Sequence, residues 1–155
     1  MSVELLNETD VAVPERDLSA LARYVLTRMR IHPAAELSVI CVDAGAMSEL
    51  HVRWMDEEGP TDVLSFPMDE LRPGNPDEDP PEGLLGDVVL CPEVAAAQAA
   101  SAGHSAEQEM RILLAHGILH LLGFDHAEPE EEAVMFGLQR SLVAGYLEGE
   151  QGEPS

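Results

Sequence analysis

Three of the six histidines of this chain lie in one short stretch, at positions 116, 120 and 126. His116 and His120 are four residues apart, so on a helix they lie one turn above each other, about 6 Å along the axis. Gly123 follows, and glycine readily adopts the left-handed conformation that ends many helices and lets the chain turn back. Such a turn would bring His126 towards the first two histidines. Three converging imidazoles without a fourth protein ligand are typical of a catalytic zinc site with an open position.

The sequence around these histidines favours a buried helix. A single histidine among leucines is usually a core residue, but the order H-x3-H-x5-H with a glycine placed for a turn favours a metal site. Ser105 and Gln108 form a capping-box pair at the expected start of the helix. The residues that follow are largely apolar: Met110, Leu113, Leu114, Ile118, Leu121 and Leu122. We therefore expect the histidines to lie in a sheltered site.

Zinc is the metal that these ligands favour first, with one ion per chain. Neutral imidazole nitrogens bind zinc at about 2.0–2.1 Å, and three of them leave room for a water molecule. Zinc lowers the pKa of that water to about 7 and can polarise a carbonyl or phosphoryl oxygen. Nickel and copper also bind imidazole, so the residues alone leave the identity of the metal open.

The histidine spacing also matches that of the metzincin proteases, H-E-x-x-H-x-x-G-x-x-H, except at one position. The glutamate that serves as general base in those enzymes is replaced here by Gly117, which argues against peptide hydrolysis. Asp125 is the nearest carboxylate in sequence to the histidines. Two roles are open to it: general base, or a positioning residue that accepts a hydrogen bond from a histidine ring or from the turn backbone.

Length and composition indicate one globular domain, residues 1–148, followed by a polar tail at residues 149–155. No run of eighteen apolar residues occurs, and the N-terminal residues carry acids rather than a basic segment followed by an apolar one. These features predict a cytoplasmic protein with no membrane partner. Cys41 and Cys91 lie in apolar, strand-like segments and are expected to be buried free thiols.

The net charge of −22 is extreme, and all eight positive charges are arginines. Because contacts to phosphate supply most non-specific affinity for nucleic acids, such a protein should bind RNA weakly through general electrostatics. Binding of RNA would have to come from a local arginine cluster, from the metal or from a protein partner. Acidity that serves only solubility is the simpler alternative.

The elements expected along the chain make an α+β domain. Strands are predicted at residues 3–6, 37–42, 62–66 and 85–91, and a loop rich in proline and acidic residues at 72–82. Helices are predicted after an Asp17 cap, at residues 46–55, in the histidine segment, and from Pro129 with its three following glutamates. We expect a small mixed four-stranded sheet packed with helices around a central metal-binding helix.

Three blocks of the sequence resemble the YbeY family, the bacterial endoribonucleases of ribosomal RNA maturation. They are PTDVLSFP at residues 60–67, LGDVVLCP at 85–92 and HGILHLLGFDH at 116–126. The resemblance spans roughly residues 36–146. It implies a compact α+β fold and one zinc ion held by His116, His120 and His126. It also implies cleavage of single-stranded RNA, with roles in maturing the 3′ end of small-subunit ribosomal RNA and in ribosome quality control.

The chain departs from this family at one place. Many members have a Tyr-Arg pair shortly before the threonine of the PTDVLSFP block, and its arginine is associated with RNA binding or cleavage. Here Trp54 and Met55 occupy those positions, and Arg53 stands beside them as a candidate RNA contact. Trp54 is either a core residue or a stacking platform for a base.

Four polar residues of the other two blocks are candidates to line a cleft, or else to cap strands and form local hydrogen bonds. They are Thr61, Asp62, Ser65 and Asp87.

Three functions compete on these residues. The first is a zinc-dependent endoribonuclease that acts on precursors of ribosomal RNA and on the small ribosomal subunit, with water or the RNA 2′-hydroxyl as nucleophile. The second is a metallohydrolase of peptides or small amides, which Gly117 disfavours. The third is a non-catalytic ribosome-assembly factor with structural zinc, which the acidity favours because ribosomal proteins are typically basic partners.

Overall fold

The computed structural model describes residues 2–32, 34–55, 62–69, 71–74 and 83–152, and for residues 51–55 and 150–152 it describes the backbone alone. The strands of this part of the chain are β1 (Ser2–Asn7), β2 (Glu36–Cys41), β3 (Val63–Pro67) and β4 (Leu84–Leu90). The helices are α1 (Glu15–Arg28), α2 (Ala44–Met55), α3 (Pro92–Ala102), α4 (Ala106–Leu121) and α5 (Pro129–Gly152).

The four strands form one mixed sheet in the order β1-β2-β4-β3. β1, β2 and β4 run parallel, whereas the edge strand β3 is antiparallel to β4. Each strand lies within one residue of its predicted bounds. The α+β class and the small mixed sheet are therefore confirmed.

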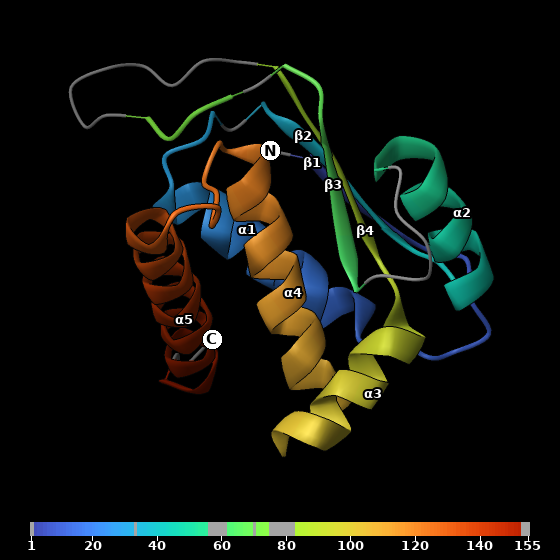
Figure 1. The fold of residues 1–155 in the computed structure, drawn as a ribbon. Coiled ribbons are helices and arrows are strands. Elements are labelled where there is room, and N and C mark those ends of the chain that lie inside the picture. The colour runs from blue at the N-terminus through green and yellow to red at the C-terminus, as the bar shows by residue number, and fades with distance from the viewer. Residues whose placement is uncertain (1, 33, 56–61, 70, 75–82, 153–155) are drawn as a thin grey trace.

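The helices are divided unequally between the two faces of the sheet. Helices α1, α4 and α5 lie on one side and α2 lies on the other (Figure 1). Helix α4 contacts β3, β4, α1, α3 and α5, so it is the central helix of the fold. The larger apolar core lies between this helical layer and the sheet, and a smaller one lies under α2. The predicted position of the histidine-bearing helix at the centre is confirmed.

The prediction that Asp17 caps the first helix is wrong. α1 begins at Glu15 after Pro14, and no side-chain capping bond is present there. Asp17 instead lies in the first turn, where its carboxylate accepts hydrogen bonds from Arg111 Nε at 2.8 Å and from the Tyr146 hydroxyl at 2.7 Å. These partners from α4 and α5 explain the difference, because a cap pattern cannot show that a carboxylate is recruited by distant residues.

Two further differences concern the helices. Helix α3 was not predicted, although it has Pro92 at its first turn and Gly103 in the left-handed conformation at its end, a common pair of helix boundaries. Helix α5 starts at Pro129 as predicted but continues to Gly152, into the segment expected to be a polar tail. Most of the predicted loop at 72–82 lies outside the described residues. None of the helices in the described part is both long and apolar enough to cross a bilayer.

Candidate metal centre

Helix α4 places two of the three histidines. The Ser105 hydroxyl caps its N-terminus by accepting a hydrogen bond from Gln108 N at 3.1 Å, as the sequence predicted. His116 and His120 lie one turn apart, and their ring centroids are 5.0 Å apart. Both rings are half-buried, while the neighbouring positions of the helix are apolar and buried. The helix therefore presents two sheltered imidazoles on one face.

The turn after α4 brings in the third histidine. Gly123 has a φ of 100°, and its N–H donates to His120 O at 3.0 Å while Phe124 N donates to Leu119 O at 3.1 Å. These two bonds form a Schellman motif, which reverses the chain because glycine tolerates the left-handed backbone. The ring of His126 then lies 5.3 Å from those of both His116 and His120. The predicted convergence of the three histidines is confirmed.

The donor set fits a metal ion. One nitrogen from each of His116, His120 and His126 lies within 4.8 Å of the other two. A tetrahedral zinc ion needs ligand nitrogens roughly 3.4 Å apart, so small ring rotations would close the group around an ion. Burial lowers the pKa of both His116 and His120, and the neighbouring histidines lower it further. Both rings are thus held in the neutral form that binds metals.

Two residues of α5 support the histidines, and the sequence did not single out either. Gln139 Oε1 lies 2.9 Å from His116 Nδ1. Because an amide oxygen only accepts, this contact keeps the proton on Nδ1 and leaves Nε2 for a metal ion. The ring of Phe136 lies 5.8 Å from His116 and 5.7 Å from His126. Their spacing of three residues places Phe136 and Gln139 on one helix face, but the pattern alone does not show what that face meets.

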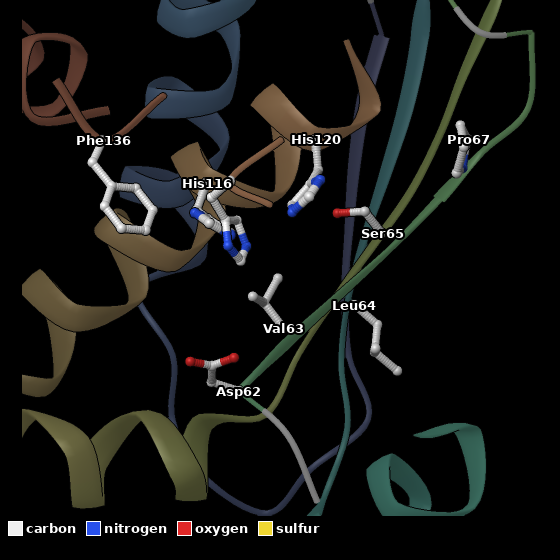
Figure 2. Close-up of a pocket in the computed structure, with 9 residues that line it drawn as sticks. Asp62, Val63, Leu64, Ser65, Pro67, His116, His120 and Phe136 are labelled. Carbon is white, nitrogen blue, oxygen red and sulfur yellow. The ribbon is translucent and has the colours of Figure 1, made fainter. Parts of the chain in front are cut away.

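The histidines form one side of a cavity of about 600 Å³, and the strand β3 forms the other. Figure 2 shows Val63 and Ser65 facing the imidazoles from this strand, and Asp62 from the residue just before it. The Ser65 hydroxyl donates to Gly117 O at 2.9 Å, so it fastens the strand to the middle of α4. Asp62 and Ser65 therefore line the cleft, one of the two alternatives left open by the sequence.

Gly117 is a glycine for a packing reason. A Cβ atom at this position would lie 2.7 Å from Val88 Cγ1, 3.1 Å from Val63 Cγ2 and 3.3 Å from Ser65 Oγ. The helix thus approaches the sheet too closely for any side chain. A base at this position, as in the metzincin pattern, is excluded by the contact with the sheet.

Asp125 lies beside the metal centre rather than in its cavity. Its side chain is exposed, and Oδ1 accepts a hydrogen bond from the backbone N–H of His126 at 2.8 Å. It lines a separate hollow of about 270 Å³ together with Phe124, Glu130, Glu131 and Val134. This hydrogen bond matches the positioning role that the sequence left open for Asp125, and its part in the reaction stays a prediction.

The remaining predicted residues lie either outside the cavity or outside the part of the chain that the structure describes. Arg53, Trp54 and Met55 end α2, and their side chains lie outside the described residues, as does Thr61. Asp87 is not among the residues that line the cavity, and it pairs with Phe66, which packs in the core under α2. Cys41 and Cys91 are buried free thiols, as predicted, and burial raises the pKa of Cys41 to about 11.

Comparison with known proteins covers almost the whole chain. The profile of the family described as endoribonuclease YbeY matches residues 4–146. A protein of that name from Beutenbergia cavernae is 64% identical over 149 residues, which span 96% of this chain and 99% of the relative. One from Clavibacter sepedonicus is 60% identical over 152 residues, 98% of this chain and 99% of the relative. The solution structure of TM1509 from Thermotoga maritima matches with a TM-score of 0.64 at 25% identity, covering 98% of this chain and 93% of its own.

Proposed function

The chain belongs to the endoribonuclease YbeY family, and from this membership we propose that it is a zinc-dependent endoribonuclease specific for single-stranded RNA. Such an enzyme is a hydrolase that acts on phosphodiester bonds. We propose that its substrate is the precursor of small-subunit ribosomal RNA, whose 3′ end it matures, and that it serves ribosome quality control in the cytoplasm.

The observation that carries the proposal is the group of three histidines at one side of a cavity of about 600 Å³. That volume is in the range of pockets that accept small ligands, so it suits one nucleotide of a flexible strand. A zinc ion bound there would supply a Lewis acid that polarises a phosphoryl oxygen and activates a nucleophile.

The side chains of the protein have separable tasks in this proposal. His116, His120 and His126 would hold the ion, and Gln139 fixes the ring of His116 through the hydrogen bond to Nδ1. The ring of Phe136 lies beside the rings of His116 and His126 and lines the same cavity. The nucleophile is either water, which leaves a linear phosphate, or the RNA 2′-hydroxyl, which leaves a cyclic phosphate, so the product termini distinguish the two.

The partner we propose is the small ribosomal subunit, reached through a basic ribosomal protein. With a net charge of −22 and eight arginines, the chain has few cations to neutralise RNA phosphates. The same charge favours association with a basic protein surface. Recruitment by a protein would therefore offset weak intrinsic affinity for RNA.

The acidity also supports a second candidate, a ribosome-assembly factor whose zinc is structural. Catalysis separates the two functions. We expect the purified protein to cut the RNA of precursor ribosomal particles and His116→Ala, with unchanged circular dichroism, to leave it intact. Equal cleavage by the parent and by His116→Ala would favour the assembly factor. So would a lack of cleavage by both, provided that metal analysis shows full occupancy of the parent. Mapping the RNA ends identifies the cut and its chemistry.

A further inference from the structure

The proposed reaction requires a group that takes a proton from the nucleophile, and the geometry at positions 117 and 125 favours neither of them. Position 117 has no room for a side chain, because a Cβ atom would lie 2.7 Å from Val88 Cγ1. The carboxylate of Asp125 accepts the His126 N–H at 2.8 Å and lines a different hollow. Among the residues that the structure describes, the next place to look is the other side of the cavity.

Asp62 stands on that side. Its backbone carbonyl accepts a hydrogen bond from Cys91 N at 3.1 Å, so its position is fixed by the pairing of β3 with β4. Figure 2 shows its carboxylate pointing from the start of β3 into the space in front of the histidines. Among the described residues that line this cavity, Asp62 carries the only carboxylate.

Asp62 faces the metal centre without being part of the ligand group. The cluster of potential metal ligands found in the described part of the chain consists of the three histidines alone. Burial lowers the pKa of His116, whereas the charge of Asp62 acts in the opposite direction and raises it. Asp62 and the three histidines line the same cavity, and the nucleophile would lie between them.

We propose that Asp62 is the general base of the reaction, an inference that rests on the proposed endoribonuclease function. The oxygen of water or of the RNA 2′-hydroxyl forms a bond to phosphorus as its proton passes to Asp62. The bond from phosphorus to the leaving oxygen breaks, and that oxygen receives the proton of the Asp62 carboxylic acid, either directly or through one water molecule that takes the proton from Asp62 as it gives its own to the oxygen. Asp62 is then a carboxylate again, and no further reactant is required.

A pair of isosteric substitutions tests this assignment, with Asp125→Asn as the matched control for Asp62→Asn. We expect Asp62→Asn to keep full zinc and parental zinc affinity but to lose on the order of 10²–10⁴-fold in single-turnover cleavage. We expect Asp125→Asn to behave differently: its zinc affinity falls by on the order of 10–100-fold, and its cleavage falls with its zinc content. Affinity of the zinc-free proteins for a single-stranded RNA should be equal or tighter for Asp62→Asn, because a negative charge is removed.

Each other outcome has a definite meaning. Parental cleavage by zinc-loaded Asp62→Asn, or loss of its zinc, overturns the assignment while the proposed function stands. Lack of cleavage by the parent itself overturns the proposed function and the base together. If Asp62→Asn fails to fold, Asp62→Ala with added formate replaces it. Restored cleavage supports a base, and no restoration in a folded, zinc-loaded variant contradicts one.

Discussion

The two walls of the metal-site cavity differ in the sequence separation of the residues that form them. The histidine wall, residues 116–126, is one stretch in which a helix, a Schellman turn and three ligands follow each other directly. The strand wall, residues 62–67, consists of the edge strand β3 and the residue before it, and its contact with α4 joins Ser65 to a residue 52 positions away. Local hydrogen bonds determine the first wall, whereas tertiary packing places the second.

This difference separates two parts of the function. The histidine wall can hold an ion through geometry that α4 and its turn set up by themselves. The strand wall carries Asp62 and contributes nothing to the ligand group of the described residues. Metal binding and proton transfer therefore depend on different walls, and substitutions can damage one without the other.

The largest expected effect is on the histidine wall itself. His120→Ala removes one of three ligands, so we expect loss of most of the zinc, about one ion per chain in the parent. Cleavage should fall by at least about 10³-fold, because the ion supplies several kcal/mol of transition-state stabilisation. Elemental analysis and single-turnover kinetics on one preparation measure both quantities. An unchanged zinc content would remove the basis for the site.

The same contrast explains how far the sequence could predict the molecule. Strand bounds, the capped helix and the convergence of the histidines follow from local patterns, and all of these are confirmed. Gln139 was missed because its partner His116 lies 23 positions away. The Asp17 cap was wrong for the same physical reason, since Arg111 lies 94 positions away. Tertiary partners cannot be read from spacing within one element.

The second prediction tests whether α5 supports the histidine wall. Gln139→Leu removes the acceptor for His116 Nδ1 at a similar size, so we expect on the order of a 10–100-fold loss of zinc affinity. Gln139→Glu keeps an acceptor at the same place and should restore most of that affinity. Competition with a chromogenic zinc chelator measures all three proteins. Equal zinc affinities for the parent and Gln139→Leu would show that the hydrogen bond from α5 does not contribute to metal binding by the histidine wall.

The third prediction concerns the contact between the walls. Gly117→Ala places a Cβ atom 2.7 Å from Val88 Cγ1 and 3.1 Å from Val63 Cγ2. Overpacking of this kind costs about 1–3 kcal/mol, more than the gain of about 1 kcal/mol in helix propensity. The control is Gly137→Ala in α5, where a Cβ atom meets nothing within 4 Å and should stabilise the protein. The midpoint temperature of thermal unfolding should fall for Gly117→Ala and rise for Gly137→Ala. Equal shifts in the two variants would contradict the close contact at Gly117.

The fourth prediction is a pH dependence of the metal-free protein. Burial lowers the pKa of His116 and His120 below the ordinary value of 6.5. The unfolded chain therefore binds protons more readily, so the stability from the neutral rings is complete above pH 6.5 and is lost as the pH falls through the folded pKa values. The free energy of unfolding of chelator-treated protein, measured between about pH 6.5 and about pH 5.5, tests this. Most carboxylates titrate below that range, so they contribute little to the change. Replacing both histidines with asparagine should flatten the dependence, and an unchanged slope would contradict it.

The smallest effect is expected from Arg53, which lies in α2 on the side of the sheet opposite α4 (Figure 1). If Arg53 replaces the arginine that Met55 lacks, Arg53→Ala should weaken RNA binding a few-fold at low salt. Each phosphate contact contributes about 0.7 to the salt slope for single strands, so loss of one contact should flatten the slope by about that amount.

The control is Arg28→Ala, which removes the same charge at another place. The Arg28 guanidinium lies 5.9 Å from the centre of the Tyr24 ring, and both residues belong to α1. Fluorescence anisotropy of zinc-free proteins with single-stranded RNA across a salt series measures both slopes. Equal RNA affinities for Arg53→Ala and the parent at every salt concentration would mean that Arg53 does not contribute. RNA binding would then come from the cavity and from a protein partner. A slope lowered by Arg53→Ala but not by Arg28→Ala would instead add α2 as a third element of the substrate site, beside the two walls.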